Sequence, residues 1–199
     1  PLPVNTFTAT DLVLDPTEYR RVRPELRARV IPIRAGRRVH VGDLICLEFE
    51  NATTLSYQVQ EMLFVEADFS PSAVAHEVSA YQRYLPTGSS LTATFFVEAE
   101  DVATVKDELH RLDGIQHSVW LTVGPKHTVL GIEIPGPDED GPSQTTASVH
   151  FLRFELDQGA RAAFLDPATP IGLQVSHPQY QASVLLPAST RAALASELT

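Results

Sequence analysis

Arginine side chains are concentrated in one short segment of this chain. Eight of its fifteen basic residues lie between Arg20 and Arg38, with Glu25 as the one acid among them, although the net charge of the whole chain is −10. A planar guanidinium group binds a carboxylate or a phosphate through two parallel hydrogen bonds. The segment therefore predicts either a site for an anionic ligand or partner, or internal ion pairs with carboxylates of the same fold.

Two interpretations of these arginines stay open. In the first, they form a binding surface together with a polar helix further along the chain, and the candidate residues are Arg23, Arg27, Arg37, Arg38, Tyr57, Gln58 and Glu61. In the second, the arginines pair with half-buried acids such as Glu61 and Glu66. A buried carboxylate that lacks a cation and hydrogen bonds would destabilise the fold by several kcal/mol, which favours the second interpretation.

Seven histidines raise the question of a metal site. No pair of them has the HxxxH, HExxH or ExxH spacing that builds zinc and di-iron sites. A divalent metal ion would therefore need ligands from distant segments, and the candidate ligands are Glu61, Glu66, His76, Glu77, His150 and His177. The alternative is that these histidines form hydrogen bonds in the core or face solvent.

Cys46 is the single cysteine, which excludes an internal disulfide and a zinc site with several cysteines. Its neighbours Leu44, Ile45 and Leu47 predict a buried thiol within a strand. The chain contains no GxSxG elbow, no phosphate-binding loop and no GxGxxG motif, which excludes the common hydrolase, nucleotide-binding and dinucleotide-binding patterns. No catalytic residue is assigned.

The composition indicates a chain that folds without a structural metal or a disulfide. It has 199 residues, of which 43% are hydrophobic, so one full core can form. No apolar run reaches the roughly 20 residues that span a bilayer, and nothing resembles a signal segment. The acidic net charge opposes general nucleic-acid binding. We expect a cytoplasmic protein that binds neither membranes nor nucleic acids.

The elements that must position these residues begin with helices. Residues 1–14 are expected to form an extended arm. A helix from Asp15 to Gly36 has a good N-cap and a capping box, although Pro24 and Pro32 predict a kink or an early end. Further elements complete a mainly helical part, residues 15–88: two short strands or one bent strand around Gly42-Asp43, a helix over 55–67 and a helix after Ser70-Pro71.

Strands dominate the second part, residues 89–199. The order strand, helix, strand, strand occurs twice, at 91–98, 101–112, 117–123 and 128–134, then at 148–156, 158–165, 171–176 and 181–186, before a closing helix over 190–198. Two such units predict a mostly antiparallel sheet with helices on one face. The expected fold is α+β, in which the N-terminal helical part packs on this sheet and residues 15–199 form a single compact domain.

Several stretches together resemble a bacterial family catalogued as domain of unknown function 3501 (DUF3501). The most specific stretch is YQVQEM at Tyr57 to Met62, and the resemblance extends from about Leu12 to Leu198. The other stretches are Glu18-Tyr19 with the following arginines, RRVHVG at Arg37 to Gly42, FEN at Phe49 to Asn51, His76-Glu77, LTAT at Leu91 to Thr94, Val119-Trp120, VHFLRF at Val149 to Phe154 and HPQY at His177 to Tyr180.

The resemblance implies a role only through the genomic setting of the family. Its members tend to be encoded near rubrerythrin-like and iron-sulfur oxidoreductase proteins, which suggests peroxide, iron or electron-transfer metabolism. This chain has neither the four cysteines of an iron-sulfur site nor the paired ExxH of rubrerythrin. The resemblance therefore implies an accessory of such a system, with a rubrerythrin-like or iron-sulfur oxidoreductase protein as its partner.

Three functional hypotheses follow. The leading one is a cytoplasmic accessory or binding protein of a redox or metal-handling system, which holds a partner protein or an anionic ligand through the arginine segment. The competing one is a metal-dependent enzyme or metal carrier that uses the glutamates and histidines named above. In the third, the same polar residues only close the core. Whether the chain is an enzyme stays open.

Overall fold

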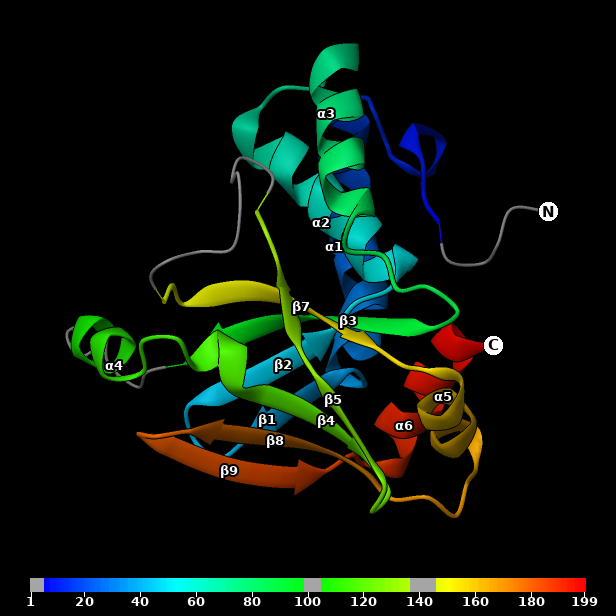
Figure 1. Ribbon diagram of the computed structural model, residues 1–199. Helices are drawn as coiled ribbons and strands as arrows, with labels where there is room; N and C mark the ends of the chain where they lie inside the picture. The colour runs from blue at the N-terminus through cyan, green and yellow to red at the C-terminus, as the bar shows by residue number, and fades with distance from the viewer. Residues whose placement is uncertain (1–5, 99–104, 137–145) are drawn as a thin grey trace.

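Two antiparallel sheets pack face to face, and a layer of helices covers one of them (Figure 1). The structure is a computed structural model that describes residues 6–98, 105–136 and 146–199. The five-stranded sheet has the order β1-β2-β3-β7-β6 and the four-stranded sheet the order β5-β4-β8-β9. The strands are β1 (Arg38–Val41), β2 (Ile45–Phe49), β3 (Ser90–Val97), β4 (Val119–Val123), β5 (His127–Leu130), β6 (Ile132–Ile134), β7 (Val149–Glu155), β8 (Ile171–His177) and β9 (Tyr180–Leu185). The predicted α+β fold with antiparallel pairing is confirmed.

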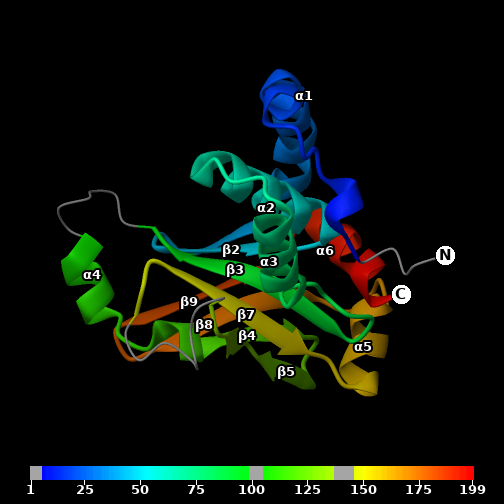
Figure 2. The same ribbon diagram turned by 90° about the horizontal axis from the view of Figure 1, so that it is seen from above.

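Helices α1 (Pro16–Ala35), α2 (Ala52–Glu66) and α3 (Pro71–Gln82) lie on the outer face of the five-stranded sheet, as Figure 2 shows from above. The other helices are η1 (Ala9–Asp11), α4 (Val105–Arg111), η2 (Ile115–Ser118), α5 (Gln158–Leu165), α6 (Ala188–Ala195) and η3 (Ser196–Leu198), where η denotes a 3-10 helix. Residues 1–5 of the predicted arm and 101–104 of the predicted fourth helix lie outside the described residues. In the part of the chain that is described, no helix is both long and apolar enough to cross a membrane.

α1 is one continuous helix of 20 residues, although Pro24 and Pro32 lie inside it. As predicted, the Asp15 side chain accepts a hydrogen bond from the Glu18 backbone N–H, and Gly36 follows the last turn. The predicted early end at a proline is wrong. Both prolines are exposed, so the backbone carbonyls that lose an N–H partner can face water. The helix therefore carries its arginines along a single length of about 30 Å.

The two predicted strand-helix-strand-strand units occupy equivalent positions in the two sheets. In each unit the first strand, β3 or β7, joins the five-stranded sheet, and the hairpin, β4-β5 or β8-β9, joins the four-stranded sheet. β3 pairs with β7, and β4 pairs with β8, both in antiparallel fashion. The repeated pattern in the sequence thus corresponds to a pseudo-two-fold arrangement of strands around one shared core.

Gly131 divides the strand predicted over 128–134 between the two sheets. β5 pairs with β4, whereas β6 pairs with β7. A Cβ atom at Gly131 would lie 2.9 Å from the Phe154 ring and 3.3 Å from the Val119 carbonyl oxygen. The prediction of one continuous strand is wrong, because the close approach that glycine permits lets the chain pass from one sheet to the other.

Alternating side chains along β2 determine what lies on each face of the five-stranded sheet. Ile45, Leu47 and Phe49 belong to the core between the two sheets, whereas Glu48 and Glu50 lie on the outer face beneath the helices. All five residues of β2 are buried. The acids on its outer face therefore need internal hydrogen-bond or ion-pair partners, and these partners define the candidate site.

Candidate functional site

Arg34, near the end of α1, is the centre of the candidate site, because it lines three adjoining hollows between α1, α2 and the sheet. Its Nε–H donates a short hydrogen bond to the carboxylate of Glu48, a residue with 2% of its surface exposed. An unpaired carboxylate at that depth would be strongly destabilising. Pairing between the arginine segment and a buried acid thus occurs here, through two residues that the sequence analysis did not select.

Two of these hollows form the candidate site. The outer groove, about 350 Å³, lies between α1 and α2 and is lined by Arg27, Val30, Ile31, Arg34, Tyr57, Gln58 and Glu61. The inner cavity, about 340 Å³, lies between the helices and the sheet and is lined by Arg34, Glu50, Leu55, Gln58, Tyr81, Thr94, Phe96, Val149 and Phe151. Arg34 and Gln58 line both, so the two hollows meet at these side chains.

The inner cavity combines apolar walls with one buried carboxyl group. Phe96 and Phe151 contribute aromatic rings to the walls. Glu50 accepts short hydrogen bonds from the hydroxyl groups of Thr54 and Thr94. Burial raises the pKa of the Glu50 carboxyl, and the two hydroxyl groups counter this shift only in part. Such a group donates a hydrogen bond to a ligand when protonated and accepts one when ionised.

We expect Glu50 to make the stability of the protein depend on pH in the direction that its raised pKa requires. A carboxyl whose pKa is higher in the folded chain stabilises the fold fully below its unfolded pKa of about 4.3. This contribution is lost as the pH rises through the folded pKa. Glu50→Gln removes the titrating group, so the variant should gain stability relative to the native chain as the pH rises from about 4 to about 8.

Urea unfolding at a series of pH values measures this effect as the difference in free energy of unfolding between variant and native chain. Glu155→Gln is the control, because Glu155 is an exposed acid of the same sheet. The Glu155→Gln difference gives the pH dependence that removal of a surface acid causes. A Glu50→Gln difference that changes with pH no more than this one would contradict a raised pKa of Glu50.

Glu61, at the outer groove, is held by a two-point ion pair with Arg23. The Arg23 Nε and Nη2 atoms lie 2.8 and 2.7 Å from the two carboxylate oxygens, and the guanidinium carbon lies 4.9 Å from the centre of the Phe64 ring. Tyr19 donates a further short hydrogen bond to Glu61. The hydrogen bonds from Arg23 hold the pKa of Glu61 below its usual range. The carboxylate at this end of the groove is therefore already satisfied.

Arg27 has a different environment from Arg23, which lies one turn earlier in α1. Its side chain is exposed, lines the outer groove and has no carboxylate partner among the residues described. Tyr57 lines the same groove from α2, and burial raises the pKa of its hydroxyl group. Since Arg23 is paired with Glu61 and Arg34 with an acid of β2, Arg27 leaves one uncompensated positive charge at the groove.

Arg37 and Arg38 lie outside the groove. Arg37 is buried and pairs with Glu197 beside the C-terminal helices. Arg38 donates hydrogen bonds to the Cys46 sulfur and to Glu98 on the outer face of the sheet. Arg23 does not line the groove, but it holds Glu61 there through an ion pair. The predicted binding residues that the structure brings together in the outer groove are Arg27, Tyr57, Gln58 and Glu61.

The six predicted metal ligands lie on four elements: Glu61 and Glu66 on α2, His76 and Glu77 on α3, His150 on β7 and His177 on β8. The two buried histidines have partners. His150 Nδ1 lies 2.6 Å from a carboxylate oxygen of Glu133, and His177 Nε2 lies 3.0 Å from a backbone carbonyl. His76 is exposed. Over the described ranges, no three of these six residues bring their ligand atoms together.

Sequence reasoning missed the polar residues that lie between the helices and the sheet. They are Glu48, Glu50 and Thr94 from the sheet and Arg34 and Tyr81 from the helices. Part of the signal is visible, because acids at alternate positions of a strand indicate one polar face. The sequence predicts that helices pack on the sheet, but it does not show that the strand of these acids joins that sheet, because this pairing is between segments far apart in the sequence.

Comparisons with known proteins place this fold in a family. A family model described as a protein of unknown function (DUF3501) matches residues 6–198. A solved structure, the crystal structure of a novel protein of unknown function from Burkholderia pseudomallei K96243 at 1.90 Å resolution, is similar with a TM-score of 0.88 and 34% sequence identity. The match covers 98% of this chain and 100% of that chain. No curated protein matches the chain.

Proposed function

The chain belongs to the DUF3501 family of proteins of unknown function, and we propose that it is a binding protein whose outer groove holds an anionic ligand. The observation that carries this proposal is Arg27, a guanidinium group without a carboxylate partner in the described structure that lines the groove beside Arg34. Two guanidinium groups at one groove favour a carboxylate or a phosphate, because both anions accept two parallel hydrogen bonds.

The inner cavity favours one of these anions. Its apolar walls include Leu55, Phe96 and Phe151, and it meets the outer groove at Arg34. The two hollows together have the size of small-molecule sites, which is about 300–1,000 Å³. An organic carboxylate with an aromatic body suits both, with its charge at Arg27 and its ring in the inner cavity. An inorganic phosphate would make no use of the apolar walls.

Phenylacetate and phenylacetamide form a matched pair of probes for this proposal. They share a ring and nearly the same shape, but only the carboxylate carries a charge. Phenylacetate should raise the melting temperature with increasing concentration, because a ligand that binds only the folded chain stabilises it by RT ln(1 + [L]/Kd). Equal shifts with both compounds would rule out an anion held by arginine, as would no shift across a panel of larger aromatic carboxylates.

The cellular role of the protein is inferred from the family resemblance. We propose an accessory role in the cytoplasm, within a redox or metal-handling system, with a rubrerythrin-like or iron-sulfur oxidoreductase protein as partner. The free, buried thiol of Cys46 suits a reducing compartment. If a partner docks at the groove through an acidic side chain, it should no longer co-purify with the Arg27→Glu variant, but it should still co-purify with the Arg29→Glu variant. Equal capture of the partner by the two variants would show that the groove does not bind it.

A further inference from the structure

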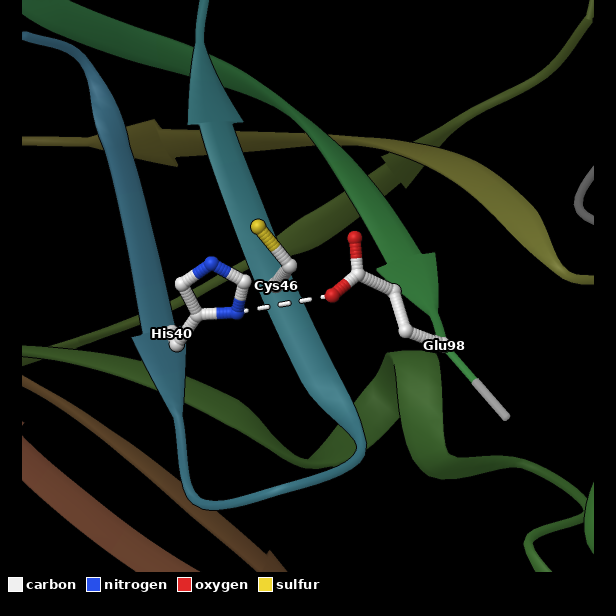
Figure 3. A group of neighbouring side chains, drawn as sticks. All are labelled: His40, Cys46 and Glu98. Atoms are coloured by element: carbon white, nitrogen blue, oxygen red, sulfur yellow. Dashed lines mark ion pairs between the residues drawn. The ribbon is translucent and has the colours of Figure 1, made fainter. Parts of the chain in front are cut away.

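Three side chains with metal-binding atoms meet at the β1 edge of the five-stranded sheet. His40 on β1 lies directly opposite Cys46 on β2. Glu98 follows the last residue of β3, and its backbone N–H donates to the Leu44 carbonyl oxygen at 2.7 Å. Figure 3 shows the three side chains pointing toward one another from these neighbouring strands. The strand register therefore brings together an imidazole, a thiol and a carboxylate.

The spacing of the donor atoms suits one shared metal ion. Ligand atoms of His40, Cys46 and Glu98 all lie within 4.8 Å of one another, and His40 Nδ1 is 3.4 Å from Glu98 Oε2. Around a tetrahedral zinc ion with bonds of about 2.0–2.3 Å, ligand atoms lie about 3.3–3.8 Å apart. His40 is exposed and Glu98 is half-buried, so these two side chains have room to rotate toward a shared ion.

The donor set indicates the class of ion. A thiolate, an imidazole and a carboxylate suit a borderline-soft divalent ion such as Zn²⁺, whereas Mg²⁺ and Ca²⁺ prefer oxygen ligands alone. Three protein ligands leave one tetrahedral position open, which is the arrangement found in catalytic rather than structural zinc sites. The group therefore fits an ion that can also contact a water molecule or a substrate.

A cation already lies between two of these ligands. The Arg38 Nε–H donates to the Cys46 sulfur at 3.1 Å, and Arg38 Nη2 lies 2.6 Å from a Glu98 oxygen. Burial raises the pKa of the Cys46 thiol, and Arg38 opposes this shift. The Arg38 side chain is partly exposed, so it can turn toward solvent when a divalent ion with twice its charge takes its place.

We propose that His40, Cys46 and Glu98 form a binding site for Zn²⁺ or a similar borderline-soft divalent ion. Binding moves Arg38 aside and releases the thiol proton of Cys46 to solvent, because the thiolate is the form that binds metal. None of the three residues belongs to the metal set expected from the sequence. The site does not include Arg27, so its test is independent of the test of the anion-binding groove.

Co²⁺ is a direct probe of this site, because a thiolate bound to Co²⁺ gives a charge-transfer absorption in the near ultraviolet. The full chain, free of any histidine tag, should bind one Co²⁺ per chain with this band, and Zn²⁺ should displace it. Cys46→Ser should remove the band. His40→Ala should weaken Co²⁺ binding by more than the about 10–100-fold that loss of an outer-shell partner of a metal site typically causes.

His76→Ala is the matched control, because it removes an exposed histidine that lies on α3 and outside the proposed site. Its Co²⁺ affinity and absorption should equal those of the native chain. His40→Ala also changes an exposed side chain, so an unchanged melting temperature will separate lost binding from lost folding. A native chain without the band, a band that survives Cys46→Ser, or loss of binding in His76→Ala would overturn the site.

Discussion

Replacing Arg37 with Met is expected to lower the free energy of unfolding by about 3–5 kcal/mol, the typical effect of removing one partner of a buried ion pair. Arg37 is 5% exposed and Glu197 is 4% exposed. The guanidinium also donates to the backbone carbonyl oxygens of Glu50 and Ala193, at 3.4 and 3.3 Å. Met replaces the aliphatic stem of Arg37 but leaves the buried carboxylate and both carbonyls without this donor.

The double variant Arg37→Met/Glu197→Met separates the charge from the packing. It should recover most of the loss, because apolar residues often replace a buried ion pair without a net change in stability. The last turn of the chain is held in place, because the adjacent Leu198 is fully buried in the core. Glu197 therefore cannot reach water by local separation of this turn. Urea unfolding of both single variants and the double variant gives the coupling energy. A loss below about 1 kcal/mol for Arg37→Met would be typical of a solvated surface pair and would contradict this account.

Arg34→Met is expected to reduce both stability and ligand binding, because Arg34 neutralises Glu48 and also lines the groove. The free energy of unfolding should fall by about 3–5 kcal/mol, since the variant leaves a buried carboxylate without its cation. Affinity for an aromatic carboxylate should fall about ten- to a hundredfold, which corresponds to the loss of one charge-assisted hydrogen bond of about 1.5–3 kcal/mol.

Adding Glu48→Gln to Arg34→Met distinguishes the two effects. Gln carries no charge, so the double variant should regain most of the lost stability while its affinity for the carboxylate stays low. Urea unfolding measures the first quantity, and calorimetric titration with phenylacetate measures the second. If stability and affinity both return in the double variant, Arg34 acts on the ligand only by maintaining the fold, and it does not contact the anion.

The starts of α1 and α3 are predictable from the sequence because their signals are local, whereas α2 begins at Ala52, three residues before the predicted start. Asp15, Asn51 and Ser70 begin α1, α2 and α3 with side chains that accept a hydrogen bond from the backbone three residues later. The two strand-helix-strand-strand units are also visible as a pattern. The division of residues 128–134 between two sheets is not, because it depends on the close approach of Gly131 to the Phe154 ring.

Only some partners of the arginines can be predicted from one sequence. Glu61, which pairs with Arg23, is one of the acids expected from the sequence, and Arg21 pairs with Glu18 in the same helix. The other partners come from distant segments. Arg37 pairs with Glu197, 160 positions further along the chain. The segregation of charge indicates only that the arginines need anions. Which acid meets which arginine depends on how α1 lies over the sheet, and this depends on the whole fold.

For the same reason, only half of the candidate site can be predicted from the sequence. Tyr57, Gln58 and Glu61 line the outer groove together with Arg27 because α1 and α2 lie side by side. The inner cavity requires the sheet, so Glu50 is absent from the residues expected from the sequence. The proposed metal site requires the strand register, since no spacing in the sequence connects its three ligands.

Calorimetric titration of phenylacetate, or of the tightest-binding aromatic carboxylate from the panel, into native, Arg27→Ala and Arg29→Ala proteins tests the central claim most directly. Arg29 is exposed on the same helix and does not line the outer groove, so its variant controls for the loss of a surface charge. We predict that Arg27→Ala weakens binding about ten- to a hundredfold and that Arg29→Ala leaves it nearly unchanged. The same affinity in all three proteins would contradict the claim that Arg27 holds the anion.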